Sequence, residues 1–176
     1  MVLLRTAAVA ACIAALASPA CAEVYTNLGY TLEGSDELDF GSAVGRVGWR
    51  SDRFFGVEAE AAGGVRTDHC CGASAPDINL HHQYAAYVTL TAPLTDSFEI
   101  FGRAGWGTTN FSYKTTPRFD EDIDSTNLGI GVQYFVGGGP DALRLDYTRM
   151  NFSDNGVKDI NRWTISWVHK FGMPTK

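Results

Sequence analysis

Trp163-Thr164-Ile165-Ser166-Trp167-Val168-His169-Lys170-Phe171 is the stretch that decides the fold, because every second residue in it is aromatic, aliphatic or histidine. Successive side chains of a β-strand point to opposite faces, so this segment has one bulky face and one mixed face. The pattern predicts a strand with an apolar environment on one side only. Near the end of an exported chain, such a strand is typical of an outer-membrane β-barrel.

The first 22 residues indicate export. Arg5 is followed by an apolar run through Leu16, and Ala20 and Ala22 supply the small residues of an A-x-A cleavage site. We therefore predict a signal peptide over residues 1–22 and a mature chain that begins at Glu23. The apolar run is too short for a transmembrane helix. Acylation of Cys21 is disfavoured because Ser18 stands where a lipoprotein signal usually has Leu.

The charge and the cysteine content argue against two classes of protein, those that bind nucleic acid and those built on a disulfide framework. The net charge is −6, and it becomes −7 on cleavage because Arg5 is the only charged residue removed. An acidic chain without a basic cluster is unsuited to nucleic acid. Only Cys70 and Cys71 remain after cleavage, and two adjacent cysteines are no disulfide framework.

The mature chain divides into eight alternating segments, an even number as in bacterial barrels. We predict strands at Val24–Glu33, Phe40–Arg50, Phe54–Val65, Asn79–Thr91, Ser97–Tyr113, Ser125–Val136, Ala142–Asn151 and Ile160–Phe171. Short connections with turn chemistry (51–53, 93–96, 137–141) alternate with mostly longer polar ones (34–39, 66–78, 114–124, 152–159). This asymmetry predicts periplasmic turns opposite extracellular loops, with one barrel domain over residues 23–171 and a short tail over 172–176.

Within the strands, one parity is apolar and the other carries charge. The charged set, predicted to form a network in the barrel interior, is Arg46, Arg50, Glu58, Glu60, Glu99, Arg103, Arg144 and Asp146. A soluble lipocalin-like barrel would reverse the two faces. The balance of four arginines against four carboxylates favours the membrane version, because a closed polar interior requires it. Two further features favour the membrane version. The lysines are confined to loops, a strand end and the tail, and the aromatic residues lie mostly near strand ends.

The last two predicted strands resemble the C-terminal end of the barrels of a known family. They are Arg144-Leu145-Asp146-Tyr147-Thr148-Arg149-Met150-Asn151-Phe152 and, after a polar loop, Trp163–Phe171. Both are similar to the last strands of the small eight-stranded barrels of the outer-membrane protein A transmembrane-domain and opacity-protein type. The resemblance implies that Trp163, Ile165, Trp167 and Phe171 form the signal read by the barrel assembly machinery. It also implies contact with outer-membrane lipids and lipopolysaccharide. No peptidoglycan-anchoring role is expected.

Two functions compete with a purely structural interior. A small gated channel would need the arginine–carboxylate pairs to exchange partners, whereas eight strands leave room only for side chains. A lipid A-modifying enzyme of this shape would use a His-x-Ser pair, but Asn151 stands where that motif needs His before Ser153. We therefore expect no enzyme activity, no cofactor and a closed core.

The loops offer weaker candidates. His69, Cys70 and Cys71, with His81 and His82 nearby in sequence, have the ligand chemistry of a zinc or copper site, but a vicinal disulfide or a link to another chain is favoured. Two acidic groups could hold Ca²⁺ or Mg²⁺, although solvated surface is the favoured interpretation. They are Glu33, Asp36, Glu37 and Asp39, and Asp120, Glu121, Asp122 and Asp124.

The sequence thus predicts a monomeric, closed outer-membrane barrel. We expect it to serve envelope integrity, or to present loops to an extracellular ligand or a host surface.

Overall fold

A computed structural model describes residues 23–35, 38–51, 54–66, 78–113, 119–153 and 159–171. The predicted signal peptide, the His69-Cys70-Cys71 segment and the tail lie outside the described residues. Among those described, no helix is long and apolar enough to cross a membrane.

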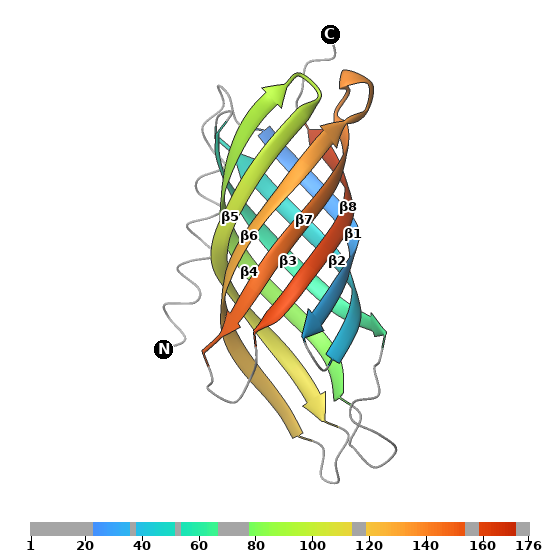
Figure 1. The fold of residues 1–176 in the computed structure, drawn as a ribbon, viewed down its shortest axis with the longest axis vertical. Helices are drawn as coiled ribbons and strands as arrows, with labels where there is room; N and C mark the ends of the chain where they lie inside the picture. The colour runs from blue at the N-terminus through green and yellow to red at the C-terminus, as the bar shows by residue number, and fades with distance from the viewer. Residues whose placement is uncertain are drawn as a thin grey trace.

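Eight antiparallel strands close into one up-and-down barrel, in which each strand pairs with the next and the last pairs with the first (Figure 1). The strands are β1 (Glu23–Ser35), β2 (Leu38–Arg50), β3 (Phe55–Arg66), β4 (Ile78–Thr95), β5 (Phe98–Tyr113), β6 (Phe119–Phe135), β7 (Asp141–Phe152) and β8 (Ile160–Phe171). A 3₁₀ turn, η2 (Val136–Gly138), joins β6 to β7. Gly137 and Gly138 have φ of 62° and 68° there, values that glycine adopts without strain. The predicted eight-stranded fold is confirmed.

Several predicted strand ends were wrong. β6 begins at Phe119 and pairs with β5 as far as Tyr113, so the acidic residues 120–124 belong to a strand and not to a loop. Figure 1 shows this hairpin extending beyond the rest of the barrel. β1 likewise continues two residues beyond its predicted end, to Ser35, and Pro93 and Leu94 continue β4 instead of forming a turn.

The stagger of the barrel follows from its register. Pairing leads from Tyr25 in β1 through Gly48, Glu58, Tyr87, Gly105, Asn127 and Met150 to Ile160 in β8. Tyr25 itself pairs with Lys170, ten residues further along β8, so the sheet closes with a shear of ten residues. An eight-stranded barrel is only wide enough for its interior to be filled by side chains.

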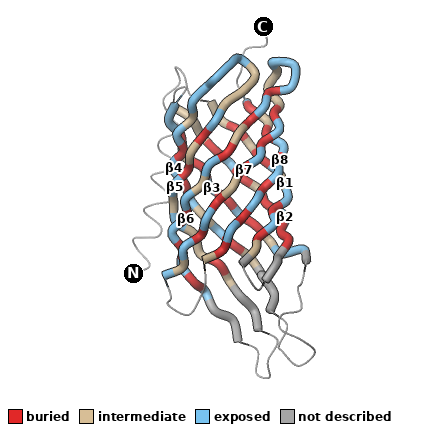
Figure 2. Tube along the Cα trace, viewed as in Figure 1, coloured by how far each residue is buried: buried red, intermediate tan, exposed pale blue. Residues whose placement is uncertain are grey.

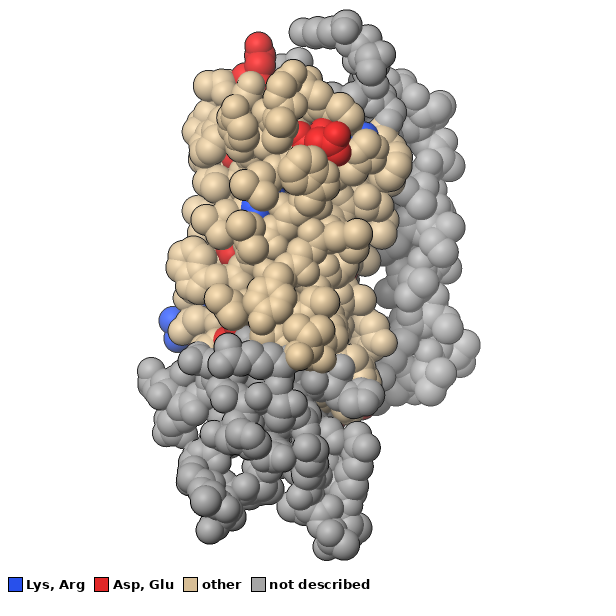
Figure 3. Space-filling model, turned by 90° about the vertical axis from the view of Figure 1, so that its right-hand side faces the viewer, with Lys and Arg blue, Asp and Glu red and all other residues tan. Residues whose placement is uncertain are grey.

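Buried and exposed residues alternate along every strand (Figure 2). The apolar parity faces outward: Leu28 is 73 % exposed and Trp106 is 75 % exposed. The charged parity faces inward, and Arg46, Glu58 and Arg103 are each 2 % exposed. The face of the outer wall seen in Figure 3 is correspondingly made up mostly of uncharged residues, with a red acidic patch near its upper end and a few smaller charged spots. This polarity excludes the soluble lipocalin-like alternative, which needs an apolar interior.

Candidate functional site: ion pairs in the barrel interior

Eight charged side chains from six strands meet in the middle of the barrel. We call them the central network: Glu33, Arg46, Glu58, Glu60, Arg103, Arg144, Asp146 and Arg162. They meet because inward residues recur at every second position and the strands are staggered around the barrel. Their side chains are at most 3 % exposed.

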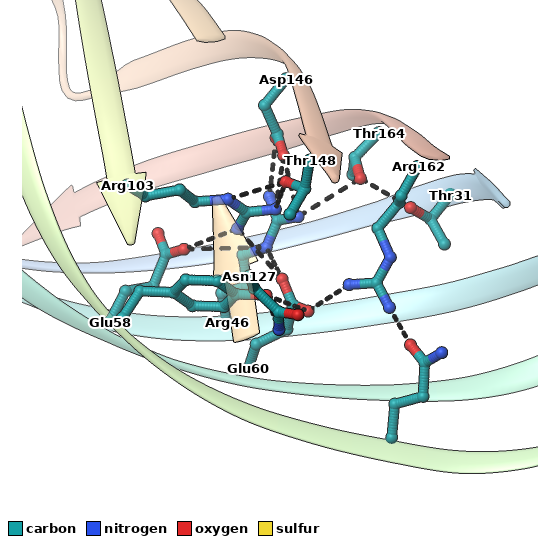
Figure 4. A network of polar contacts seen from close by, with 12 residues as sticks. Thr31, Arg46, Glu58, Glu60, Arg103, Asn127, Asp146, Thr148, Arg162 and Thr164 are labelled. Atoms are coloured by element: carbon teal, nitrogen blue, oxygen red, sulfur yellow. Dashed lines mark hydrogen bonds and ion pairs between the residues drawn. The ribbon is translucent and has the colours of Figure 1, made fainter. Parts of the chain in front are cut away.

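Arg46 and Arg103 hold the middle of this network (Figure 4). Arg46 Nε donates to Glu60 Oε2 at 2.7 Å, and its Nη1 donates to Asp146 Oδ2 at 2.9 Å. Arg103 Nη1 lies 3.1 Å from both Glu58 Oε1 and Glu60 Oε2, while its Nη2 lies 2.8 Å from Asp146 Oδ1. Each arginine therefore connects carboxylates from two different strands, β3 and β7.

Arg144 and Arg162 extend the network along the barrel. Arg144 Nη1 donates to Glu58 Oε2 at 2.7 Å, and its guanidinium lies 4.0 Å from the centroid of the Phe101 ring. Arg162 pairs with Glu33 at 3.0 Å and also with Glu60. Stacking on an aromatic face favours a guanidinium already removed from water.

Neutral side chains satisfy much of the remaining hydrogen bonding. Tyr25 donates to Glu58 at 3.0 Å, and the Thr148 hydroxyl accepts from Arg103 at 2.6 Å. Gln83 Nε2 donates to Glu33 at 2.9 Å. Such satisfaction matters because a buried ion repays its desolvation only when its partners are well placed.

A second group, the end cluster, lies at the end of the barrel that carries the short turns. It consists of Glu23, Arg50, Glu99 and Lys170. Arg50 contacts Glu23 and Glu99 at 3.1 Å each, and Lys170 Nζ lies 3.1 Å from Glu23 and 3.9 Å from the centroid of the Phe135 ring. The central network contains four cations and four carboxylates, and the end cluster contains two of each. Both are neutral in formal charge.

A family model for the outer membrane protein β-barrel domain matches residues 4–171. The chain belongs to this family.

Solved structures of other outer-membrane barrels share the fold. OprG from Pseudomonas aeruginosa superposes with a TM-score of 0.68 at 13 % identity, over 87 % of this chain and 97 % of OprG. Ail of Yersinia pestis, in complex with the heparin analogue sucrose octasulfate, gives 0.64 at 13 % identity, over 86 % of this chain and all of Ail. Neisserial surface protein A gives 0.56 at 17 % identity, over 85 % and 95 %. No curated protein matches the sequence.

All eight interior residues predicted for this outer-membrane barrel lie in the two groups. Arg50 and Glu99 belong to the end cluster, and the other six belong to the central network. Sequence reasoning did not place the other four members, Glu23, Glu33, Arg162 and Lys170, in the charged interior. Arg162 shares the parity of Thr164 and Ser166, so the alternation of the final strand could have revealed it.

Glu33 was correctly predicted to lie in a strand, but it does not belong to the acidic group of the neighbouring loop. Its side chain is 1 % exposed and pairs with Arg162 inside the barrel, because β1 continues to Ser35. Of the other acidic residues, Asp122 and Asp124 are exposed on β6, and Asp122 accepts from Asn110 at 2.8 Å. Asp36 and Glu37 lie outside the described residues, as do the side chains of Asp39, Asp120 and Glu121.

The predicted assembly signal occupies the outer face of β8, where Trp163, Ile165, Trp167 and Phe171 are exposed. Trp167 Nε1 and His169 Nδ1 both contact Asp141 Oδ1 on β7, at 3.1 and 2.8 Å. Asn151, which stands where a His-x-Ser motif would need histidine, lies exposed on the outer face of β7, two residues before Ser153. Within the described ranges, no three His, Cys, Asp or Glu side chains gather in a metal-binding group.

Proposed function

We propose that this outer-membrane barrel is a non-conducting, non-enzymatic scaffold that presents its extracellular segments for contact with other molecules. The observation that carries the proposal is the charge-balanced interior. The contact between Arg46 and Asp146 joins β2 to β7, and that between Arg162 and Glu60 joins β8 to β3. An ion crossing the barrel would have to separate these buried pairs.

Planar-bilayer recording tests the closed interior. Purified protein inserted at known orientation and density should add no current steps above those of empty membrane. Discrete steps would contradict the proposal and favour a small gated channel, in which Arg103, already in contact with three carboxylates, exchanges partners.

Enzyme activity is tested separately. Expression in a Gram-negative host should leave the mass spectrum of lipid A unchanged. A mass change that disappears in the Ser153→Ala variant would identify a lipid-modifying enzyme instead.

The charge of the long connections indicates the kind of molecule that they contact. The segments 34–39, 66–78, 114–124 and 152–159, which comprise the long connections and the strand ends beside them, contain eleven acidic residues and four basic ones. The acidic residues are Asp36, Glu37, Asp39, Asp68, Asp77, Asp120, Glu121, Asp122, Asp124, Asp154 and Asp159, and the basic ones are Arg66, Lys114, Arg118 and Lys158. Ail was crystallised with a highly sulfated ligand. An acidic surface repels a polyanion, so we propose cationic surfaces or peptides as the contact class here.

A retention experiment tests this preference. Protein in detergent should pass through a heparin column at physiological salt and bind immobilised polylysine, with binding that weakens as salt rises. Retention on heparin would contradict the proposed ligand class, whereas it would leave the closed interior untouched.

A further inference from the structure

A pair of polar residues interrupts the apolar outer wall where β7 begins and β8 ends. Asp141 and His169 are partners in the register of these two strands, and their side chains are 40 % and 42 % exposed. Further along the same outer face, Leu143, Leu145 and Ile165 are exposed and apolar. The polar pair therefore marks the level at which the lipid-facing wall ends, at the end of the barrel with the short turns.

The carboxylate of Asp141 joins three side chains, Asp141, Trp167 and His169, which we call the rim cluster. Its Oδ1 atom accepts from His169 Nδ1 at 2.8 Å and from Trp167 Nε1 at 3.1 Å. The His169 ring also meets the Phe171 ring edge-on, with 4.8 Å between the two centroids. Both hydrogen bonds go to Oδ1, and none of the described residues donates to Oδ2, so this second oxygen is left for a partner from outside the chain.

The atoms that the rim cluster leaves free are hydrogen-bond acceptors. A carboxylate has no proton to give, and a neutral imidazole that donates through Nδ1 keeps Nε2 as an acceptor. Thr26 lies opposite His169 on β1, and its hydroxyl can accept as well as donate. Among the described residues of β6, β7, β8 and β1, no arginine or lysine lies on the outer face at this end of the barrel. The rim cluster therefore suits a cation that carries several N–H donors.

The membrane supplies such a cation at this level. Exposed aromatic residues near the ends of barrel strands, as Trp167 and Phe171 are, lie at the depth of the lipid headgroups. A primary ammonium headgroup has one positive charge and three N–H donors. Water can donate to the same atoms, but it brings no charge to Asp141 and no acyl chains to the neighbouring apolar wall.

We propose that the rim cluster binds the headgroup ammonium of one phospholipid of the phosphatidylethanolamine class. The ammonium donates to Asp141 Oδ2 and to His169 Nε2, and the acyl chains run along the exposed side chains of β7 and β8. A quaternary ammonium has the same charge but no N–H to donate, so the site discriminates against choline lipids. The bound lipid lies at the end of the barrel away from the long connections, so it takes no part in the contacts proposed above.

Native mass spectrometry of the purified mature barrel in detergent tests the headgroup chemistry. Short-chain phosphatidylethanolamine, its N-methyl and N,N-dimethyl forms, phosphatidylcholine and phosphatidylglycerol are titrated separately at about pH 8, which favours the neutral imidazole. One ethanolamine lipid should be retained per barrel, and retention should fall as methyl groups replace N–H donors at constant charge. Equal retention of the choline lipid would overturn the proposal. Stronger retention of the glycerol lipid would overturn it too, because the site would then be binding the phosphate.

Two substitutions locate the site on the barrel. Asp141→Asn keeps the side-chain size and removes the charge, so it should weaken retention of the ethanolamine lipid by about tenfold, as loss of a charge-assisted hydrogen bond does. Asp96→Asn is the matched control, because it removes an exposed carboxylate from the turn between β4 and β5 at the same end, and it should retain the lipid as the wild type does. Equal retention by Asp141→Asn and wild type, or an equal loss in both variants, would contradict a site at the rim cluster. The methylation series uses the wild type alone, so it decides the headgroup chemistry even if Asp141→Asn is unstable.

Discussion

Arg103 shows how much more a buried arginine should contribute to the stability of this barrel than an exposed arginine on the outer wall. Its guanidinium is buried between Glu58, Glu60 and Asp146, so the Arg103→Met variant would leave buried carboxylates without their shared partner. Breaking a buried ion pair in this way costs about 3–5 kcal/mol. We expect a loss of that size in the free energy of unfolding, measured by urea titration of tryptophan fluorescence in lipid vesicles.

Arg149→Met is the matched control. Arg149 pairs with Asp159 at 2.7 Å, but the two side chains are 58 % and 39 % exposed. An exposed pair of this kind contributes about 0–1 kcal/mol. Equal losses in the two variants would show that the central network contributes no more than a surface pair.

Gly105 is a residue whose small size the barrel requires. A Cβ added at this position would lie 2.0 Å from the carbonyl oxygen of Ala86 in the neighbouring strand, and backbone cannot move aside cheaply. Gly105→Ala should therefore destabilise the barrel by about 1–3 kcal/mol, as overpacking does. Gly45→Ala is the control, since its Cβ would meet only Leu28 Cδ2 at 3.6 Å, and it should leave the urea midpoint within error or slightly raised.

At the scale of the strands, the sequence predicted which segments form strands but not where all of them end. The region 119–124 is polar and acidic, so its composition indicated a loop. In the structure it pairs with β5, and Asn110 donates to Asp122 across the two strands. Cross-strand pairing can override a poor local strand propensity, and no single strand shows that partnership by itself.

The final strand carries the clearest prediction at this scale. Phe171 is 48 % exposed on the outside of β8, where nothing in the barrel interior depends on its side chain. If it belongs to an assembly signal, Phe171→Ala should slow the appearance of folded protein in living cells, as followed by pulse-chase. Refolding of the purified variant into pure lipid vesicles, where no machinery is present, should proceed at the wild-type rate.

Phe55→Ala supplies the control for this experiment. Phe55 is 41 % exposed at the start of β3, so its removal takes a similar ring away from the lipid-facing wall. It should not slow assembly in cells. Slow assembly of both variants would mean that lost lipid contact, and not recognition of β8, limits folding.

On the scale of the whole molecule, the alternation along the strands predicted which face is polar, and the balance of charges predicted that this face is enclosed. Which individual charges pair with each other could not be predicted from the sequence. Arg46 and Asp146 are 100 residues apart and meet only because the sheet closes with its particular stagger. Closure is a property of all eight strands together. For the same reason, the alternation of β8 places Lys170 on the same face as Thr164 and Ser166, but its pairing with Glu23 could not be predicted from its position in the chain.

Closure also determines how the whole barrel should respond to detergent. Every strand is hydrogen-bonded on both sides, so opening the barrel in SDS requires the loss of a complete strand pairing together with buried ion pairs. Protein purified from outer-membrane fractions should migrate faster on SDS gels without boiling than after it. Boiled Arg103→Met should match boiled wild type, and its unboiled compact form should convert at a lower temperature. Recovery of the protein as a soluble periplasmic species with no mobility shift would contradict the membrane barrel itself.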